Sequence, residues 1–70
     1  RIAAAIERFR NALKLDPVRS DALYGLAEAY RGMNRIDDAR AYYQRYVSSN
    51  APDIRPELQT DARRKLEQLR

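Results

Sequence analysis

The sequence predicts an all-α fold, an antiparallel stack of helix–turn–helix units with about four helices. Its composition is that of a helical protein: Ala, Leu, Arg, Glu and Gln are frequent, and the 70 residues include only two Gly and three Pro. Apolar residues recur at helical spacing in four segments. The third segment also repeats the first at an offset of 34 residues, which indicates a repeated helical unit.

The first helix is expected over about residues 2–15. Its apolar residues fall on one stripe of a helix surface: Ile2, Ile6, Phe9 and Leu13. Asp16 precedes Pro17, and a residue before proline is disfavoured in the α region. The helix should therefore end at this point, where the chain turns toward the second helix.

The second helix is expected over about residues 20–33, with Ser20 or Asp21 as its N-cap. Its apolar face contains Leu23, Leu26, Ala27 and Tyr30. Asn34 should end this helix, because asparagine tolerates the left-handed conformation that often follows a helix C-terminus.

The third helix is expected over about residues 36–49, with Asp37 and Asp38 near the positive end of its dipole. Asn50, Ala51 and Pro52 should break it. A fourth helix should begin near Pro56, a residue that suits the first helical position. The apolar stripe of this fourth helix is Leu58, Ala62, Leu66 and Leu69.

The 34-residue offset relates residues of matching size and chemistry in the first and third helices. The matched pairs are Ile2 with Ile36, Ala5 with Ala39, Phe9 with Tyr43, and Leu13 with Val47. The proline that follows the first helix, Pro17, returns one residue late as Pro52. Two unrelated amphipathic helices would share their spacing but not small, aromatic and proline positions together, so the period indicates a true repeat.

On these residues the chain resembles the tetratricopeptide repeat family. That family's first helix typically carries a bulky residue, Leu, a small residue and Tyr, which correspond here to Leu23, Leu26, Ala27 and Tyr30. Its second helix typically carries Ala, an aromatic, a small residue and Pro, which correspond in the first segment to Ala5, Phe9, Ala12 and Pro17. The corresponding residues of the third segment are Ala39, Tyr43, Tyr46 and Ala51. Tyr46 thus replaces a small residue, and the proline falls at position 52.

The resemblance implies a right-handed superhelical stack that forms a single domain over residues 1–70. Within it, residues 1–19 would be the second helix of a partial repeat, residues 20–53 one complete repeat, and residues 54–70 a C-terminal capping helix. The outer face of that cap is expected to carry Arg63, Arg64, Lys65, Glu67 and Arg70. Because the sequence begins at Arg1 rather than Met, we expect a piece of a longer protein, and its Arg- and Ala-rich composition suggests a bacterial one.

The composition argues against most kinds of catalytic chemistry. The sequence contains no His and no Cys, which removes the common nucleophiles and bases, disulfides, and imidazole or thiolate metal sites. Asp37 and Asp38 suit a helix start better than a metal or acid–base site. We therefore expect no catalytic residues, no metal and no cofactor. No apolar run approaches the ~20 residues that a membrane-spanning helix needs.

The resemblance instead implies a binding surface on the first helix of the complete repeat. The residues expected to face this concave groove are Asp21, Tyr24, Gly25, Glu28 and Arg31. Tyr24 offers a flat amphipathic contact, Gly25 would leave room for a peptide backbone, and the two carboxylates would favour a basic segment. The expected partner is a protein or peptide. The Lys and Asn with which chaperone-binding members grip a C-terminal carboxylate are replaced here, so that ligand is not expected.

Two alternatives come from other classes of function. Self-assembly is one, because the first helix would lack part of its cover and could contact another copy through Ile2, Ile6, Phe9 and Leu13. Nucleic-acid binding is the other, given the net charge of +4 and a last segment that contains Arg55, Arg63, Arg64, Lys65 and Arg70. Glu57, Asp61 and Glu67 interrupt these basic residues, which favours a solvated face over a phosphate-binding surface.

Overall fold

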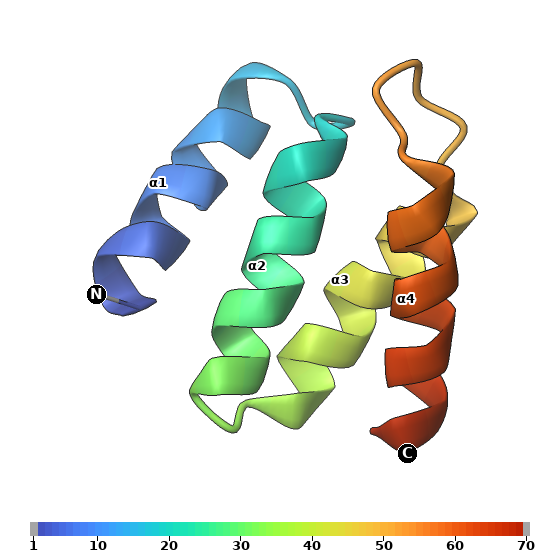
Figure 1. Ribbon diagram of the computed structural model, residues 1–70. Coiled ribbons are helices and arrows are strands. Elements are labelled where there is room, and N and C mark those ends of the chain that lie inside the picture. The colour runs from blue at the N-terminus through green and yellow to red at the C-terminus, as the bar shows by residue number, and fades with distance from the viewer. Residues whose placement is uncertain (1, 70) are drawn as a thin grey trace.

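The structure, a computed structural model, describes residues 2–69. These residues form four α-helices and no strand: α1 (Ile2–Leu15), α2 (Ser20–Gly32), α3 (Ile36–Ser48) and α4 (Pro56–Gln68). Successive helices run in opposite directions, with α1 and α4 at opposite ends of the row (Figure 1). α2 packs against both α1 and α3, and α3 packs against α4. The predicted all-α fold is confirmed, and the ends of the first three helices and the start of the fourth agree with the expected ones to within one residue.

The turns follow the local signals of the sequence. Asn34 adopts a positive φ of 60°, and the N–H of Arg35 donates to the carbonyl of Tyr30 at 2.9 Å, which closes the last turn of α2. α1 ends just before Asp16, and Pro56 is the first residue of α4, as expected from the fixed φ of proline.

The start of α2 differs from the prediction. Ser20 and Asp21 already lie inside the helix, and the N-cap position belongs to Arg19, whose side chain makes no capping hydrogen bond. The N–H of Ser20 instead donates to the carboxylate of Asp53 at 3.0 Å, which comes from the loop between α3 and α4. A distant acidic side chain thus takes the place of the local cap that the sequence predicts, next to the positive end of the α2 dipole.

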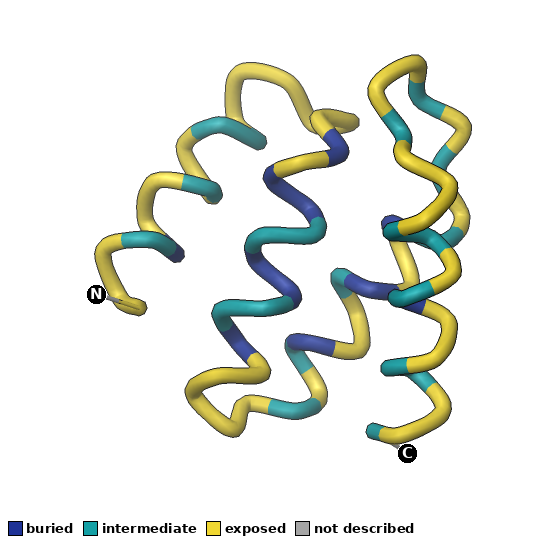
Figure 2. The backbone as a smooth tube through the Cα atoms, viewed as in Figure 1, coloured by how far each residue is buried: buried dark blue, intermediate teal, exposed yellow. Residues whose placement is uncertain are grey.

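The core lies along α2 and α3, whereas α1 and α4 are mostly exposed (Figure 2). The buried cluster consists of Ile6, Leu23, Leu26, Ala27, Tyr30, Ala39, Tyr43, Tyr46 and Ala62. Ala27 and Ala39 are fully buried, as expected where small residues let two helices approach closely. Burial of these apolar side chains is the main stabilising contribution, at ~25 cal/mol per Å².

The exposed stripe expected on α1 is only partly open. Ile6 reaches the core with 8% of its surface exposed, while Phe9 and Leu13 pack half-buried against that core. Ile2 is the most open member, at 43%. The edge proposed for self-assembly is therefore narrower than the sequence pattern suggests.

Candidate partner-binding site

Three of the five predicted groove residues meet on one face of α2. Tyr24, Glu28 and Arg31 are spaced by four and three residues, so they share a face of the helix. There they contact Tyr43 from α3 and two residues from α4. We call this group the polar cluster; it comprises Tyr24, Glu28, Arg31, Tyr43, Asp61 and Lys65.

The ammonium group of Lys65 lies at the centre of the polar cluster. Its Nζ lies 2.7 Å from Oε2 of Glu28 and 2.9 Å from Oδ2 of Asp61. It also donates to the hydroxyl of Tyr24 at 3.1 Å. These three acceptors match the three hydrogens of an ammonium group. Nζ lies 5.4 Å from the ring centroid of Tyr24 as well, within the range of a cation–π interaction.

The acidic groups of the polar cluster are held by further donors. The hydroxyl of Tyr24 donates to Asp61, and the hydroxyl of Tyr43 donates to Glu28. The Nε of Arg31 donates to the Tyr43 hydroxyl at 3.1 Å, and the Nη2 of Arg31 lies 3.4 Å from Oε1 of Glu28. Two carboxylates and two cations are thus brought together, so the charges balance within the cluster.

These contacts shift the pKa values of the groups that form them. Burial pushes the pKa of Glu28 up, but the hydrogen bonds from Lys65 and Tyr43 outweigh burial, and the net pKa is lowered. The hydrogen bonds from Tyr24 and Lys65 lower the pKa of Asp61. Burial lowers the pKa of Lys65, whereas its bonds to the two carboxylates and to Tyr24 prevail and raise it. All three groups therefore stay charged at neutral pH.

Two members of the polar cluster, Lys65 and Asp61, lie where the sequence pattern does not predict them. The pattern predicts Lys65 on the outer face of the last helix, and this prediction is wrong, because its side chain is only 18% exposed and faces α2. Asp61 does more than interrupt a run of basic residues, since it contacts both Tyr24 and Lys65. The i, i+4 spacing of Asp61 and Lys65 was the one available signal, since it puts both on a single face of α4.

The other two predicted groove residues lie outside the polar cluster. Asp21 is exposed and forms an ion pair with Arg19, at 2.9 Å. Gly25 lies beneath the ring of Phe9, where an added Cβ would come within 2.5 Å of the ring's Cζ atom. The room above Gly25 is therefore occupied by a side chain of α1.

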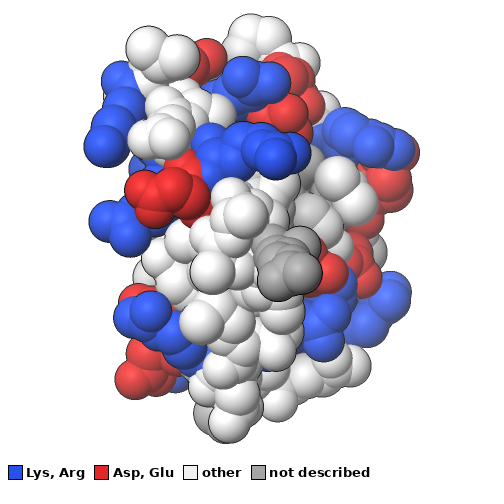
Figure 3. All heavy atoms as spheres, turned by 90° about the vertical axis from the view of Figure 1, so that its left-hand side faces the viewer, with Lys and Arg blue, Asp and Glu red and all other residues white. Residues whose placement is uncertain are grey.

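A shallow apolar hollow of about 480 Å³ borders the polar cluster on its α1 side. It is lined by Ile2, Ala5, Phe9, Gly25, Glu28 and Ala29. Glu28 thus belongs to both the hollow and the polar cluster. Figure 3, which faces the α1 side of the molecule, shows a continuous area of uncharged side chains with charged groups on its two flanks.

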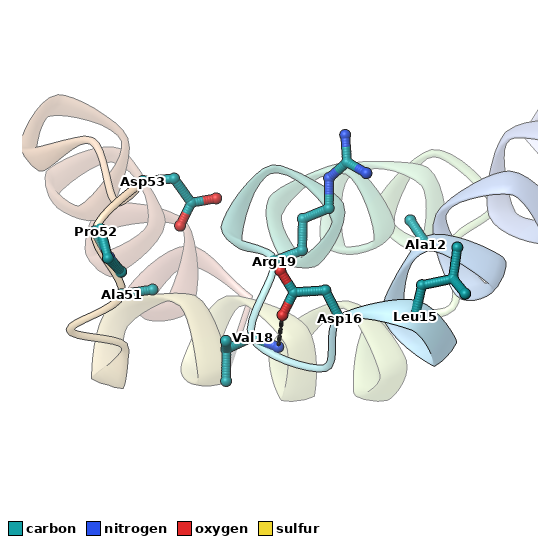
Figure 4. A pocket seen from close by; sticks show the side chains of 8 residues that line it. All are labelled: Ala12, Leu15, Asp16, Val18, Arg19, Ala51, Pro52 and Asp53. Carbon is teal, nitrogen blue, oxygen red and sulfur yellow. Dashed lines mark hydrogen bonds between the residues drawn. The ribbon is translucent and has the colours of Figure 1, made fainter.

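A second hollow of about 410 Å³ lies between the turn that follows α1 and the loop that precedes α4 (Figure 4). Its lining includes Leu15 and Val18, which are 91% and 61% exposed. Asp16 accepts the N–H of Val18 at 3.3 Å, so its carboxylate stabilises the turn. In the close-up view the side chains of this lining spread apart rather than converge, so the hollow near Glu28 is the better candidate for a binding site.

Within residues 2–69 no group of acidic side chains could hold a metal ion, and no helix there is long and apolar enough to cross a membrane. Two of the basic residues of the last segment are engaged by contacts within the chain. Arg55 pairs with Glu57 at 3.4 Å, and Lys65 faces α2. Arg70 lies outside the described residues.

Comparison with known proteins places the chain in a family. Residues 1–61 match the family model described as tetratricopeptide repeat. No curated protein and no solved structure matches the chain. Members of this family generally mediate protein–protein interaction. Since the match extends over most of the sequence and the four helices agree with it, the chain belongs to the tetratricopeptide repeat family.

Proposed function

We propose that this chain is a protein-interaction module, of the scaffold or adaptor kind, that binds a peptide or protein segment across α2. Within it, residues 20–53 would form the complete repeat, between the partial repeat and the cap. The observation that carries the proposal is the position of the apolar hollow directly beside Glu28. An apolar recess flanked by a few well-placed charges is the usual character of a site that binds a segment of another protein.

The two parts of this surface would take different side chains. The walls formed by Ile2, Ala5 and Phe9 suit a bulky apolar side chain, whose burial contributes ~25 cal/mol per Å². Glu28 lies at the margin, with its side chain 34% exposed, and its Oε1, which Arg31 approaches only to 3.4 Å, can accept a hydrogen bond from a basic residue next to that apolar one. We propose a binding role rather than a catalytic one because the sequence has neither His nor Cys for nucleophilic or general-base chemistry.

Replacing Ala29 with Arg tests this surface. The longer side chain would fill the hollow and repel a basic partner, so peptides selected on the wild-type chain from a random display library should bind A29R at least tenfold more weakly. Ala3 lies exposed on α1 and does not line the hollow, so Ala3→Arg is the matched control. Circular dichroism would establish that both variants keep their helices.

Equal peptide affinity for A29R and A3R would overturn the proposed site. Sedimentation of the wild-type chain distinguishes the self-assembly alternative. A dimer that A29R dissociates and A3R leaves intact would show that the occupant of the hollow is a second copy. A monomer that binds selected peptides supports the adaptor role.

A further inference from the structure

We propose that Tyr24, Glu28, Tyr43 and Asp61 form a receptor for the ammonium group of a lysine on a partner segment, and that Lys65 occupies this receptor from within the chain. This receptor rests on the proposed function, because the lysine would belong to the partner segment proposed above. The partner segment would carry that lysine beside the apolar residue that enters the hollow.

The coordination of Lys65 defines the ligand class. Three acceptors surround one nitrogen, at 2.7, 2.9 and 3.1 Å. Two tyrosine rings lie 5.4 and 5.8 Å from the same nitrogen. Converging acceptors around a single atom suit the compact ammonium of lysine, whereas a planar guanidinium would need two acceptors side by side.

The receptor is organised by contacts that do not involve Lys65. The hydroxyl of Tyr43 holds one oxygen of Glu28. Arg31 approaches the other oxygen of Glu28 at 3.4 Å and donates to Tyr43. The hydroxyl of Tyr24 holds Asp61. Because these bonds would persist without the lysine, the carboxylates should keep their places when it leaves, and a preorganised site binds more tightly than one that must form on binding.

Charge and exposure make the receptor accessible to an external cation. Without Lys65, the cluster itself would keep two carboxylates and one cation, Arg31, and would be net negative, while the exposed Arg64 attracts Asp61 without a hydrogen bond to it. The side chains of Glu28 and Asp61 are 34% and 31% exposed, so both can be reached from solvent. An incoming ammonium would meet partly desolvated acceptors, where a charge-assisted hydrogen bond is stronger than in water.

Lys65 then sets the threshold for binding. A group tethered within the same chain acts at an effective concentration of roughly millimolar or more. Free lysine at a concentration below this effective concentration would therefore not displace the side chain of Lys65. A segment that also fills the hollow gains the extra affinity it needs, and Glu28 joins the two subsites because it lines both. The receptor would thus select segments that carry an apolar residue and a lysine together.

Chemical rescue tests the receptor without any partner. Lys65→Ala should lower the melting temperature, and n-propylammonium chloride should restore at least half of that loss in a saturable manner, since a ligand that binds only the folded state stabilises it. Sodium chloride at equal ionic strength, and 1-propanol, should not. Arg63 is exposed on the same helix, so Arg63→Ala is the control and should show no response.

The conservative variant Lys65→Met keeps the test decisive if K65A does not fold. Its side chain ends one atom short of Nζ, so ammonium chloride should stabilise it and potassium chloride should not. The absence of any ammonium-specific stabilisation in the variant that folds would overturn the receptor.

Library selection tests the partner's lysine. Peptides selected on K65M should be enriched in lysine at one position, and replacing that lysine with Gln should cost about tenfold or more in affinity. Selected peptides without such enrichment would overturn the partner assignment. Rescue by propylammonium together with equal peptide affinity for A29R and A3R would show instead that the proposed function fails while the receptor stands.

Discussion

At the scale of single residues, Gly25 shows how a helical glycine can be favoured by packing. Glycine within a helix costs about 1 kcal/mol relative to alanine, because its backbone loses more freedom on folding. Here the missing Cβ lets the ring of Phe9 lie directly on the α2 backbone, where any added atom would meet the ring at 2.5–2.7 Å. The contact between α1 and α2 therefore depends on this glycine.

A double-mutant cycle on Gly25 and Phe9 measures that dependence. In the wild-type background Gly25→Ala should destabilise the chain by about 1 kcal/mol, because displacement of the ring outweighs the gain in helix propensity. In a Phe9→Ala background the same change should stabilise it by about 1 kcal/mol, since only the propensity remains. Urea denaturation of the four proteins gives both values. Gly25→Ala effects of the same sign in both backgrounds would contradict the packing argument.

At the scale of elements, α4 is attached to α3 through the end of that helix. The side-chain Nε2 of Gln59 lies 3.1–3.4 Å from the carbonyl oxygens of Tyr46, Val47 and Ser49. These carbonyls lie at the C-terminal end of α3. The last carbonyl groups of a helix have no hydrogen-bond partners within the helix, so they need donors from elsewhere. The hydroxyl of Tyr46 in turn accepts the N–H of Arg55 at 3.3 Å. One amide side chain thus caps α3 and fixes the position of α4.

Replacing Gln59 with Glu would turn this cap into a repulsion. A carboxylate has no hydrogen to donate and would face the negative end of the α3 dipole, so Q59E should lose about 1–2 kcal/mol at pH 7. The protonated acid regains a donor, so Q59E should recover part of this loss below pH 4 relative to wild type. Thermal denaturation at pH 7 and 3.5 measures this, with Gln68→Glu, an exposed site at the end of α4, as control. A loss in Q59E that does not depend on pH would contradict the capping role.

The helices could be predicted from the sequence because their signals are local. Asp16-Pro17, Asn34 and Pro56 act through the backbone conformation of their own residues, and the 34-residue offset marks the repeat. The polar cluster could not be predicted in the same way. Lys65 meets Glu28 across 37 residues of sequence, and only the packing of α4 brings the two together. Likewise Ser20 receives its acceptor from Asp53, a contact with no local pattern.

At the scale of the whole molecule, small size makes the polar cluster important for stability. The chain has 70 residues, and its fold extends over 29 × 27 × 15 Å. A chain of this length buries a small core, and domains of this size are only marginally stable. Contacts between α2 and α4 that would be minor in a larger protein therefore affect whether the chain stays folded.

The acid sensitivity of the chain should depend on Lys65. The pKa values of Glu28 and Asp61 are lowered in the folded state, from ordinary values of 4.5 and 3.8. Because folding lowers the pKa values of both carboxyl groups, the ionised carboxylates stabilise the fold at any pH above their ordinary pKa values. This stabilisation is lost as the pH falls through the pKa values of the folded state. The melting temperature of the wild-type chain should therefore decline between about pH 5 and pH 3. The ammonium group of Lys65 is the largest lowering influence on the pKa of Glu28 and acts after Tyr24 on the pKa of Asp61. Lys65→Met should therefore be less stable at pH 7 yet show a flatter decline.

Arg63→Met separates this effect from a general change of charge. It also removes one positive charge from α4, but from an exposed site. A charge-assisted hydrogen bond contributes about 1.5–3 kcal/mol, and each kcal/mol corresponds to roughly 4–8 °C in a domain of this size. Because Glu28 and Asp61 are 34% and 31% exposed, solvent screening reduces this contribution to about 1 kcal/mol. K65M should therefore lose about 5 °C less than R63M between pH 6 and pH 3.5 in parallel thermal scans. If the two variants lost stability equally, acid denaturation would have to act through carboxylates other than Glu28 and Asp61. Asp53, which accepts the N–H of Ser20 at the start of α2 and whose pKa is lowered by its contact with Ser20, would be the next to test.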